Sequence, residues 1–403
     1  MVSKSEVNMS IIRIGDVCTW AKGYQVPRDD TSVDKEIPYL HYGDLYKLYG
    51  FRLDLEEKYD QIIKIDADSK IKTEQYLHDG DIVFTFTSET VDDLGHCTLI
   101  INPADRPFVT GMETTVVHIT NRESVLPAYL NYYFQSRKFQ REVRQFVTGM
   151  KVYRVHPDDL MDMVVDIPEM VIQKRIVAAL DPFSDKILAN TKLNANLSNQ
   201  ARVAFSSLME TADLSKAVLS EVADITMGQS PPGESLSEDC AGTLFYQGRA
   251  EFGEIFPTPR LYTSEPKRMA SKGSVLMSVR APVGDINLAL DECCIGRGLS
   301  SIQSNEGLSG YVHYLMDYLK PQLDIFNGDG TVFGSINKES VNNLEILIPS
   351  KEDREKFDKL ATAIDAIIEL NHREILKLQE FRDYLLPKLI SGEIDVSNLP
   401  LPD

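Results

Sequence analysis

The sequence predicts a mixed α/β (α+β) protein in which two globular domains are joined by two long helices that form an antiparallel coiled coil. Residues 349–392 repeat the stretch that begins at Pro168, at a constant offset of 181 positions. Both copies place apolar residues three and four apart, as the seam of paired helices requires. The segments before the two copies also match in order, which indicates an internal pseudo-twofold repeat.

The two helical segments are predicted to be each other's partner, because neither can bury so long a seam alone. The first seam contains Ile176, Leu180, Phe183, Ile187, Asn190, Asn194, Leu197, Ala201, Ala204 and Leu208. The second contains Phe357, Ala361, Ile364, Ile368, Asn371, Ile375, Leu378, Arg382, Leu385 and Leu389. At ~1.5 Å per residue, about 40 residues make a rod of roughly 60 Å, which suits a spacer. The alternative is two independent helices, each packed on its own domain.

Two features interrupt the apolar pattern. Asn190 and Asn371 occupy matching seam positions. A polar seam residue costs stability but fixes register, so a structural role is favoured over a ligand contact, near the middle of the pair. Pro182 removes a hydrogen bond inside the first helix but is favourable directly after a capping Asp181, which predicts a kink or a restart there.

Composition places the chain among soluble globular proteins. Its 403 residues are 43% hydrophobic and 26% charged, enough for two or three domains. We find neither an apolar run of 18 residues nor a secretion leader, so we expect a cytoplasmic protein without a membrane span. Its five cysteines are odd in number and lack CxxC spacing, which argues against a disulfide framework and against a metal site.

The net charge of −19 argues against a nucleic-acid partner at first, because phosphates are bound by Lys and Arg. Binding depends on local patches, however, and not on the total charge. Residues 137–154 hold six basic side chains and one acid, and Arg249–Arg280 holds six against three acids. Nucleic acid therefore stays a candidate partner.

Short strands and turns are predicted from Ile11 onward, followed by a helix over Pro127–Phe146 and a strand into Pro168. The second half repeats this order: Leu219–Gly228 matches Ile14–Gly23 at an offset of 205, Gly273 matches Gly80 at 193, and Gly330 matches Gly149 at 181. The predicted boundaries are 10–167 for the first domain, 168–212 for the first helix, 213–348 for the second domain and 349–395 for the second helix.

Catalytic motifs are missing from the sequence. We find no GxSxG, HExxH, P-loop or strand-linked GxGxxG pattern. Gly328–Ser335 has the glycines of a phosphate loop but lacks its lysine and following helix, so a turn is the better interpretation. The chain is therefore predicted to bind without catalytic residues of its own.

Candidate nucleic-acid contacts lie in loops that follow matched glycines or strand ends. Gln and Arg can make paired hydrogen bonds to adenine or guanine edges, whereas Lys, Ser and Thr suit phosphates. For each residue alone, an ordinary solvated loop position is the competing interpretation. The candidates are Tyr24, Gln25, Lys151, Tyr153, Arg154, Gln229, Ser230, Gln247, Arg249, Arg280, Thr331 and Ser335.

With these features the chain resembles the specificity (S) subunits of type I restriction-modification systems. The resemblance rests on the double repeat, on the IPxxxxQKRI start of the first helix (Ile167–Ile176) with its counterpart IPSKEDREKF, and on the closing LLPKLISGEI (Leu385–Ile394). It spans nearly the whole chain.

The resemblance implies two target recognition domains, each reading one half of a split site in double-stranded DNA. It implies that the helices set the spacing and dock two methyltransferase subunits, which carry S-adenosylmethionine, and that an endonuclease subunit joins for restriction. No cofactor is then expected in this chain, and it is not itself an enzyme. Pro182 departs from the family pattern, as does Arg354 where the first copy has Gln173, which bears on whether the two docking sites are equal.

Two other functions compete with this one. A fused methyltransferase would need an NPPY-like tetrapeptide, and none occurs. A helical scaffold that spaces two protein-binding domains would need no DNA readout. Salt-dependent binding to duplex DNA separates recognition from scaffolding, and the identity of the partner protein tests the rest.

Overall fold

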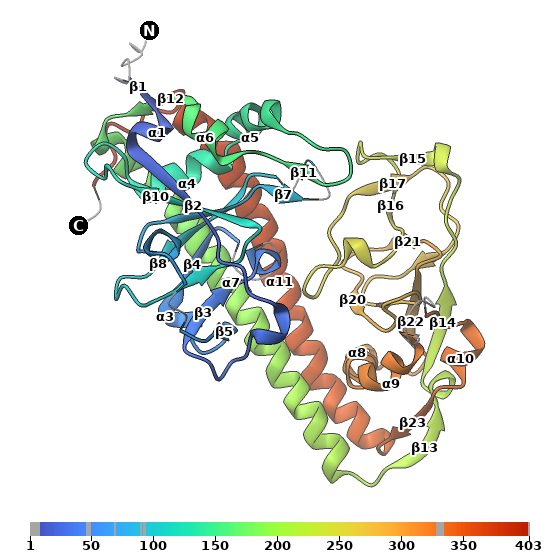
Figure 1. Cartoon of the computed structure of the whole chain (residues 1–403). Coiled ribbons are helices and arrows are strands. Elements are labelled where there is room, and N and C mark those ends of the chain that lie inside the picture. The colour runs from blue at the N-terminus through green and yellow to red at the C-terminus, as the bar shows by residue number, and fades with distance from the viewer. Residues whose placement is uncertain are drawn as a thin grey trace. The chain divides into compact units, whose positions relative to one another are not determined.

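The computed structural model describes residues 9–45, 50–67, 70–88, 91, 94–327 and 334–401. The chain divides into two units (Figure 1): unit 1 comprises Met1–Ile187 and Leu376–Asp403, and unit 2 comprises Leu188–Ile375. Each unit combines a mixed α/β head with parts of two long helices, α7 (Met170–Thr211) and α11 (Lys351–Ile390). This confirms the predicted fold class.

The long helices run antiparallel. In unit 1 the beginning of α7 shares a core with the end of α11, through Ile176, Leu180, Leu386 and Leu389. In unit 2 the end of α7 shares a core with the beginning of α11, through Ala201, Phe205, Phe357 and Ala361. Opposite ends of the two helices meet in each unit, so the predicted orientation is confirmed.

α7 continues without interruption through Pro182, so the restart predicted there is wrong. The residues on either side are tied to the head of unit 1: the Tyr132 hydroxyl lies 3.0 Å from Asp181 Oδ1 and 2.9 Å from Ser184 Oγ. These contacts hold the turn in place although proline lacks the amide that would extend the hydrogen-bond ladder.

The single helix predicted over Pro127–Phe146 is divided into α4 (Pro127–Gln135), α5 (Arg137–Val143) and the 3₁₀ turn Arg144–Phe146. Ser136 causes the division, because it is extended and its hydroxyl accepts a hydrogen bond from the Phe139 amide at 3.2 Å. Serine competes with helical hydrogen bonding in this way and favours an N-cap.

The head of unit 1 is built around a five-stranded sheet in the order β2-β10-β6-β8-β4. Its elements are β1 (Met9–Arg13), α1 (Ile14–Val17), β2 (Cys18–Lys22), β3 (Ile37–Leu40), α2 (Tyr42–Asp44), β4 (Arg52–Asp54), α3 (Leu55–Lys58), β5 (Lys64–Ile65), β6 (Ile82–Thr85), β7 (Thr87–Ser88), β8 (His96–Ile101), β9 (Val109–Thr110), β10 (Thr114–Ile119), α4, α5, β11 (Tyr153–Arg154), α6 (Pro157–Asp162) and β12 (Val164–Pro168). Smaller sheets pair β1 with β12, β11 with β7, and β3 with β5 and β9.

The head of unit 2 has a four-stranded sheet, β14-β22-β19-β20, and a five-stranded sheet, β15-β17-β16-β21-β18. Its elements are β13 (Ser215–Val218), β14 (Ala223–Met227), β15 (Leu236–Ser237), β16 (Thr243–Tyr246), β17 (Leu261–Thr263), β18 (Met269–Ala270), β19 (Val275–Ser278), β20 (Ile286–Leu288), β21 (Cys293–Ile295), β22 (Leu299–Ser304), α8 (Ser309–Tyr318), α9 (Lys320–Asp324), α10 (Lys338–Asn342) and β23 (Glu345–Ile348).

The two heads follow one topology. β2-β10-β6-β8 of unit 1 corresponds to β14-β22-β19-β20 of unit 2, and the flanking pair β1-β12 corresponds to β13-β23. A matched glycine ends the first strand of each sheet: a Cβ on Gly23 would lie 1.8 Å from Gly111 O, and one on Gly228 would lie 2.1 Å from Gly296 O. A side chain at either position would collide with backbone, which explains why the glycines recur.

Candidate nucleic-acid interface

In unit 2, three of the predicted residues meet where β14 and β16 end. Gln229 is exposed, and its backbone amide donates to the Ile295 carbonyl at 2.9 Å. The Ser230 hydroxyl donates to Gln247 Oε1 at 3.0 Å. The amide end of Gln247 is therefore oriented by a neighbour while the residue as a whole stays exposed. Such a fixed, exposed amide can offer a donor and an acceptor to a base edge.

Arg297 belongs to the same cluster and was not among the predicted residues. It is exposed in the turn between β21 and β22, and its amide donates to Ser230 Oγ at 3.3 Å. The flanking glycines let the turn approach Gln247, since Cβ atoms on Gly296 and Gly298 would lie 2.9 and 2.8 Å from its backbone. We name Gln229, Ser230, Gln247 and Arg297 the Gln–Arg tip of unit 2. A Gly-Arg-Gly turn is the only sequence signal for Arg297.

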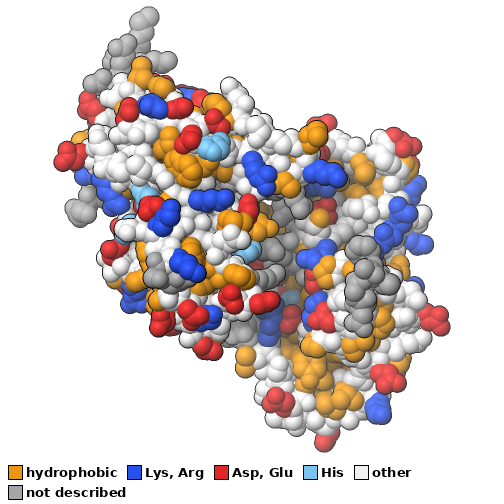
Figure 2. All heavy atoms as spheres, viewed as in Figure 1, with side chains coloured by type: hydrophobic (Ala, Val, Ile, Leu, Met, Phe, Trp, Pro, Cys, Tyr) orange, Lys and Arg blue, Asp and Glu red, His pale blue; other side chains and the backbone are white. Residues whose placement is uncertain are grey.

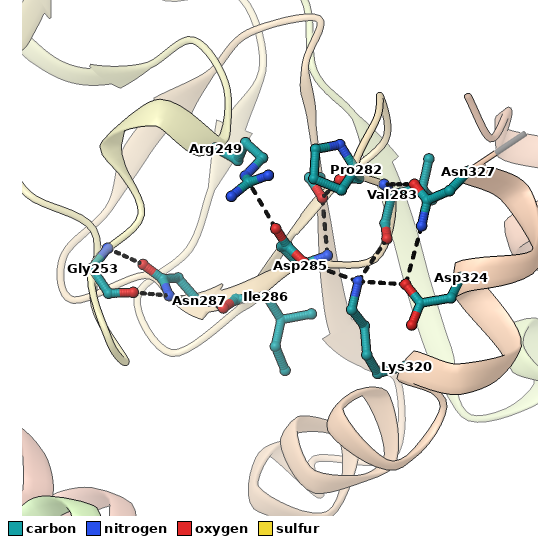
Figure 3. A network of polar contacts seen from close by, with 11 residues as sticks. Arg249, Gly253, Pro282, Val283, Asp285, Ile286, Asn287, Lys320, Asp324 and Asn327 are labelled. Carbon is teal, nitrogen blue, oxygen red and sulfur yellow. Dashed lines mark hydrogen bonds and ion pairs between the residues drawn. The ribbon is translucent and has the colours of Figure 1, made fainter. Parts of the chain in front are cut away.

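Arg249 is engaged within unit 2. Its Nε lies 3.0 Å from Asp285 Oδ2, and Lys320 Nζ lies 2.9 Å from Asp285 Oδ1. Figure 3 shows both cations pointing toward this carboxylate. Burial lowers the pKa of Lys320, but hydrogen bonds to Asp324 and Asp285 outweigh this effect and raise the pKa overall. The network holds the loop after β19 in place, so Arg249 has a structural partner already.

The corresponding loop of unit 1 carries Tyr24 and Gln25. The Tyr24 amide donates to Thr110 O at 2.7 Å, and its carbonyl accepts from the Tyr39 hydroxyl at 3.2 Å. Tyr24 is half-buried in the small core around Tyr39 and Val109, whereas Gln25 is exposed. The turn that matches Arg297 contains Met112 instead. The two loops thus share a backbone path but present different side chains.

A two-residue ladder in unit 1 and an isolated bridge in unit 2 hold further predicted residues. In unit 1, Arg154 and half-buried Tyr153 on β11 pair with Thr87 and Ser88 on β7, and exposed Lys151 precedes them. In unit 2, Arg280 and Ser335 form an antiparallel bridge. Arg154, Arg280 and Ser335 are exposed. Thr331 lies outside the described residues.

The charge on the face that Figure 2 draws is mixed. Figure 2 shows Lys and Arg side chains in small groups among Asp and Glu, and not as one basic face. Several cations have carboxylate partners, such as Arg202 with Asp317 at 2.9 Å and Arg373 with Asp291 at 2.8 Å. Among the described residues, the guanidinium groups of Arg154 and Arg280 have no such partner, and both residues are exposed.

Asn190 and Asn371 lie in the helix pair within unit 2. Asn371 Nδ2 donates to Asn194 Oδ1 at 2.8 Å, and Asn190 Nδ2 donates to Glu374 Oε2 at 2.7 Å. Asn190 and Asn194 are buried. Each polar seam residue therefore has a partner on the other helix, and that geometry suits a role in fixing register.

Metal-binding and membrane-spanning features were searched over the described residues only. Among them, no three His, Cys, Asp or Glu side chains gather as a metal site would require. None of the helices in the described ranges combines the length and the hydropathy of a membrane span. Cys18, Cys97, Cys293 and Cys294 are free thiols in the cores, and burial raises the pKa of Cys18 and of Cys293 to about 12.

Comparison with known proteins agrees with this architecture. The model of the type I restriction modification DNA specificity domain matches residues 6–199 and 219–380. A protein named "Putative type I restriction enzyme MjaX specificity subunit", from Methanocaldococcus jannaschii, is 28% identical over 93% of this chain and 88% of its own length. The type I restriction enzyme HindI specificity subunit of Haemophilus influenzae is 30% identical over 32% of this chain and 29% of its own length.

The fold comparison points the same way. The crystal structure of a type I restriction-modification system S subunit from M. genitalium covers 96% of this chain and 98% of its own, with a TM-score of 0.54 and 14% identity. At that identity it supports the fold alone. The family match, in contrast, covers both repeats of the sequence. The chain belongs to the type I restriction-modification DNA specificity family, as a non-catalytic specificity subunit.

Proposed function

We propose that the heads at 10–167 and 213–348 each read one half of a bipartite site in double-stranded DNA, and that the two long helices set the distance between the halves. The observation that carries this proposal is the repeated topology with different loop side chains. Two domains with the same backbone topology can present different hydrogen-bond donors and acceptors from equivalent loops, so each can recognise a different base sequence.

For unit 2 we assign base readout to the Gln–Arg tip. Gln247 is oriented by Ser230, and Arg297 stands beside it on a turn fixed by two glycines. Gln pairs with adenine and Arg with guanine through two hydrogen bonds each, and each such pair discriminates by about 1–3 kcal/mol. In unit 1 the equivalent readout falls to Gln25 and its neighbours.

We also propose that α11 docks the methyltransferase subunits, which would carry S-adenosylmethionine, and that an endonuclease subunit joins them for restriction. A stripe of exposed apolar side chains supports docking: Leu360, Ile367 and Leu370 in unit 2, and Phe381 and Tyr384 in unit 1. The spacings are seven and three residues within unit 2 and three residues within unit 1, so each unit carries part of an apolar stripe on α11 that is separate from the seam facing α7. A seam of this kind fits another helix.

Gln173 and Arg354 lie outside this docking surface. Both are buried, and each is bonded to its own head: Gln173 to the Ser124 carbonyl at 2.8 Å and Arg354 to Glu306 at 2.9 Å. The difference between them therefore does not alter the exposed seam of α11.

The test of two-part readout is the mapping of methylated adenines in the DNA of cells that carry the chain with its methyltransferase. Replacing residues 10–167 with the matching head of a relative should change one half of the methylated sequence and keep the other half and the spacer. Inserting residues into both helices should change the spacer alone. If the head exchange altered both halves, the two-reader proposal would be wrong.

Docking is tested by Ile367→Glu, which places a charge on the exposed seam. Leu193→Glu on α7 is the matched control, because Leu193 is 44% exposed and Ile367 is 46% exposed. We expect Ile367→Glu to abolish co-purification with the methyltransferase and Leu193→Glu to preserve it. Equal co-purification of both variants would exclude this face as the docking site.

A further inference from the structure

The β11–β7 ladder of unit 1 and the Arg280–Ser335 bridge of unit 2 each place an arginine opposite a hydroxyl, but from opposite sides of the pair. In unit 1, Arg154 pairs with Thr87; in unit 2, Arg280 pairs with Ser335. At the sequence offsets of 193 and 181, Arg280 corresponds to Thr87 and Ser335 corresponds to Arg154. The arginine and the hydroxyl have therefore exchanged places between the two units.

The surrounding backbone shows that the positions correspond. The Val155 amide donates to Phe86 O at 3.1 Å, and the Ile336 amide donates to Val279 O at the same distance. One residue further on, His156 caps α6 and Asn337 caps α10 with side chains that accept a backbone amide. The exchange thus takes place within a backbone arrangement that both units repeat.

Directly opposed residues of an antiparallel ladder project from the same face, with Cβ atoms about 5 Å apart. Moving the arginine across the ladder therefore keeps the guanidinium over the same patch of surface. Among the described residues, neither Arg154 nor Arg280 has an ion-pair or hydrogen-bond partner for its guanidinium, and both are exposed. In the same unit as Arg280, Arg249 is held by Asp285 at 3.0 Å.

We propose that each arginine–hydroxyl pair binds one phosphate group of the DNA backbone, and that the two units supply the same contact from opposite strands. A guanidinium and a hydroxyl on one face both donate to a phosphate oxygen, and such contacts position a protein without reading sequence. Because phosphates are identical in all half-sites, this contact can be retained while the base-reading tips differ. The inference rests on the proposed DNA recognition.

The test moves the arginine across the ladder. Arg154→Ser should weaken binding of the chain, in complex with its methyltransferase, by roughly tenfold or more, equally for a duplex that carries the mapped target and for one that does not. The slope of log affinity against log salt should fall by about one. Adding Thr87→Arg to Arg154→Ser should restore affinity and slope, and the methylated sequence should stay the same in all variants.

Unit 2 provides the reciprocal pair, Arg280→Thr and Arg280→Thr with Ser335→Arg. Lys216→Ser on β13, which removes an exposed cation outside both basic stretches of the sequence, controls for net charge. If the second substitution does not restore binding, the proposal that either strand can supply the arginine is wrong. If the methylated sequence changes, the arginine reads bases and does not bind a phosphate. If the wild-type complex binds duplex DNA and the single variants bind as well, this inference alone fails. If the wild-type complex shows no salt-dependent binding, the proposed function fails with it.

Discussion

Unit 1 and unit 2 share the strand order β2-β10-β6-β8 and β14-β22-β19-β20 in their central sheets, but different polar interactions stabilise the two units. Where Gln173 anchors the start of α7 with neutral hydrogen bonds, Arg354 anchors the start of α11 through Glu306 and lies over the Tyr311 ring. The apolar pattern and the close-approach glycines are repeated, whereas the polar groups are not. The shared topology is therefore set by apolar burial and backbone geometry. The polar side chains can differ between the two units without changing it.

The largest effect is expected where the two anchors differ. Gln173 accepts from the Leu126 amide at 2.8 Å and donates to the Ser124 and Pro168 carbonyls. Gln173→Ala leaves these groups unpaired and should destabilise unit 1 by roughly 3 kcal/mol. Arg354→Ala should destabilise unit 2 by only about 1–2 kcal/mol, because Glu306 keeps access to water.

Chemical denaturation of both variants, followed by a probe in each unit, measures this difference. A larger loss of unfolding free energy for Arg354→Ala than for Gln173→Ala would contradict this expectation. It would mean that the buried charge contributes more to stability than the number of hydrogen bonds.

The helix pair offers the second comparison. Asn371→Ala removes the donor to Asn194 within unit 2 and should cost about 1 kcal/mol. Replacing Asn194 and Asn371 together with Leu should instead raise the stability and loosen the register, since both polar groups leave the seam at once. Thermal unfolding measures the first effect, and disulfide cross-linking between cysteines placed along α7 and α11 measures the second. A double variant less stable than Asn371→Ala would contradict this account.

The smallest effect concerns pH and separates unit 1 from unit 2. His118 Nδ1 lies 2.8 Å from buried Asp81, its Nε2 lies 2.8 Å from the Glu74 carbonyl, and its ring is 6.1 Å from that of His78. Burial lowers the pKa of His118, but Asp81 and the Glu74 carbonyl outweigh it, so the pKa is raised overall. Unit 2 has Gln303 and Ser274 at the corresponding places.

A raised pKa in the folded state means that the contribution of His118 to stability is complete below the ordinary histidine pKa of about 6.5 and is lost as pH rises through the higher folded value. Unfolding midpoints measured on both sides of this window should show a fall for the wild type that His118→Gln removes. An unchanged pH dependence in His118→Gln would mean that another group is responsible.

Much of the fold could be predicted from the sequence, because it depends on local patterns that occur twice in the chain. The offset of 181 identified both helices, and Gly23 with Gly228 marked equivalent strand ends. The division at Ser136 and the continuity through Pro182 could not be predicted, because a capping hydroxyl and the bonds of Tyr132 are features of packing.

The candidate site was predictable only in part, since side chains distant in sequence decide it. Arg249 is held by Asp285, and the turn that carries Arg297 approaches Gln247 only through the close contacts of Gly296 and Gly298. The bridge between Arg280 and Ser335 joins positions on either side of α8 and α9. A local sequence pattern does not predict contacts between residues this far apart in the chain.

The central claim is that the two units read separate halves of one DNA site, and variants at the two loops test it most directly. Methylated adenines would be mapped in cells that carry the methyltransferase with the wild-type chain, with Arg297→Ala or with Gln25→Ala. We expect Arg297→Ala to relax one base pair in one half of the target, Gln25→Ala to relax the other half, and the spacer to stay constant. Relaxation of both halves by either single variant would contradict the account.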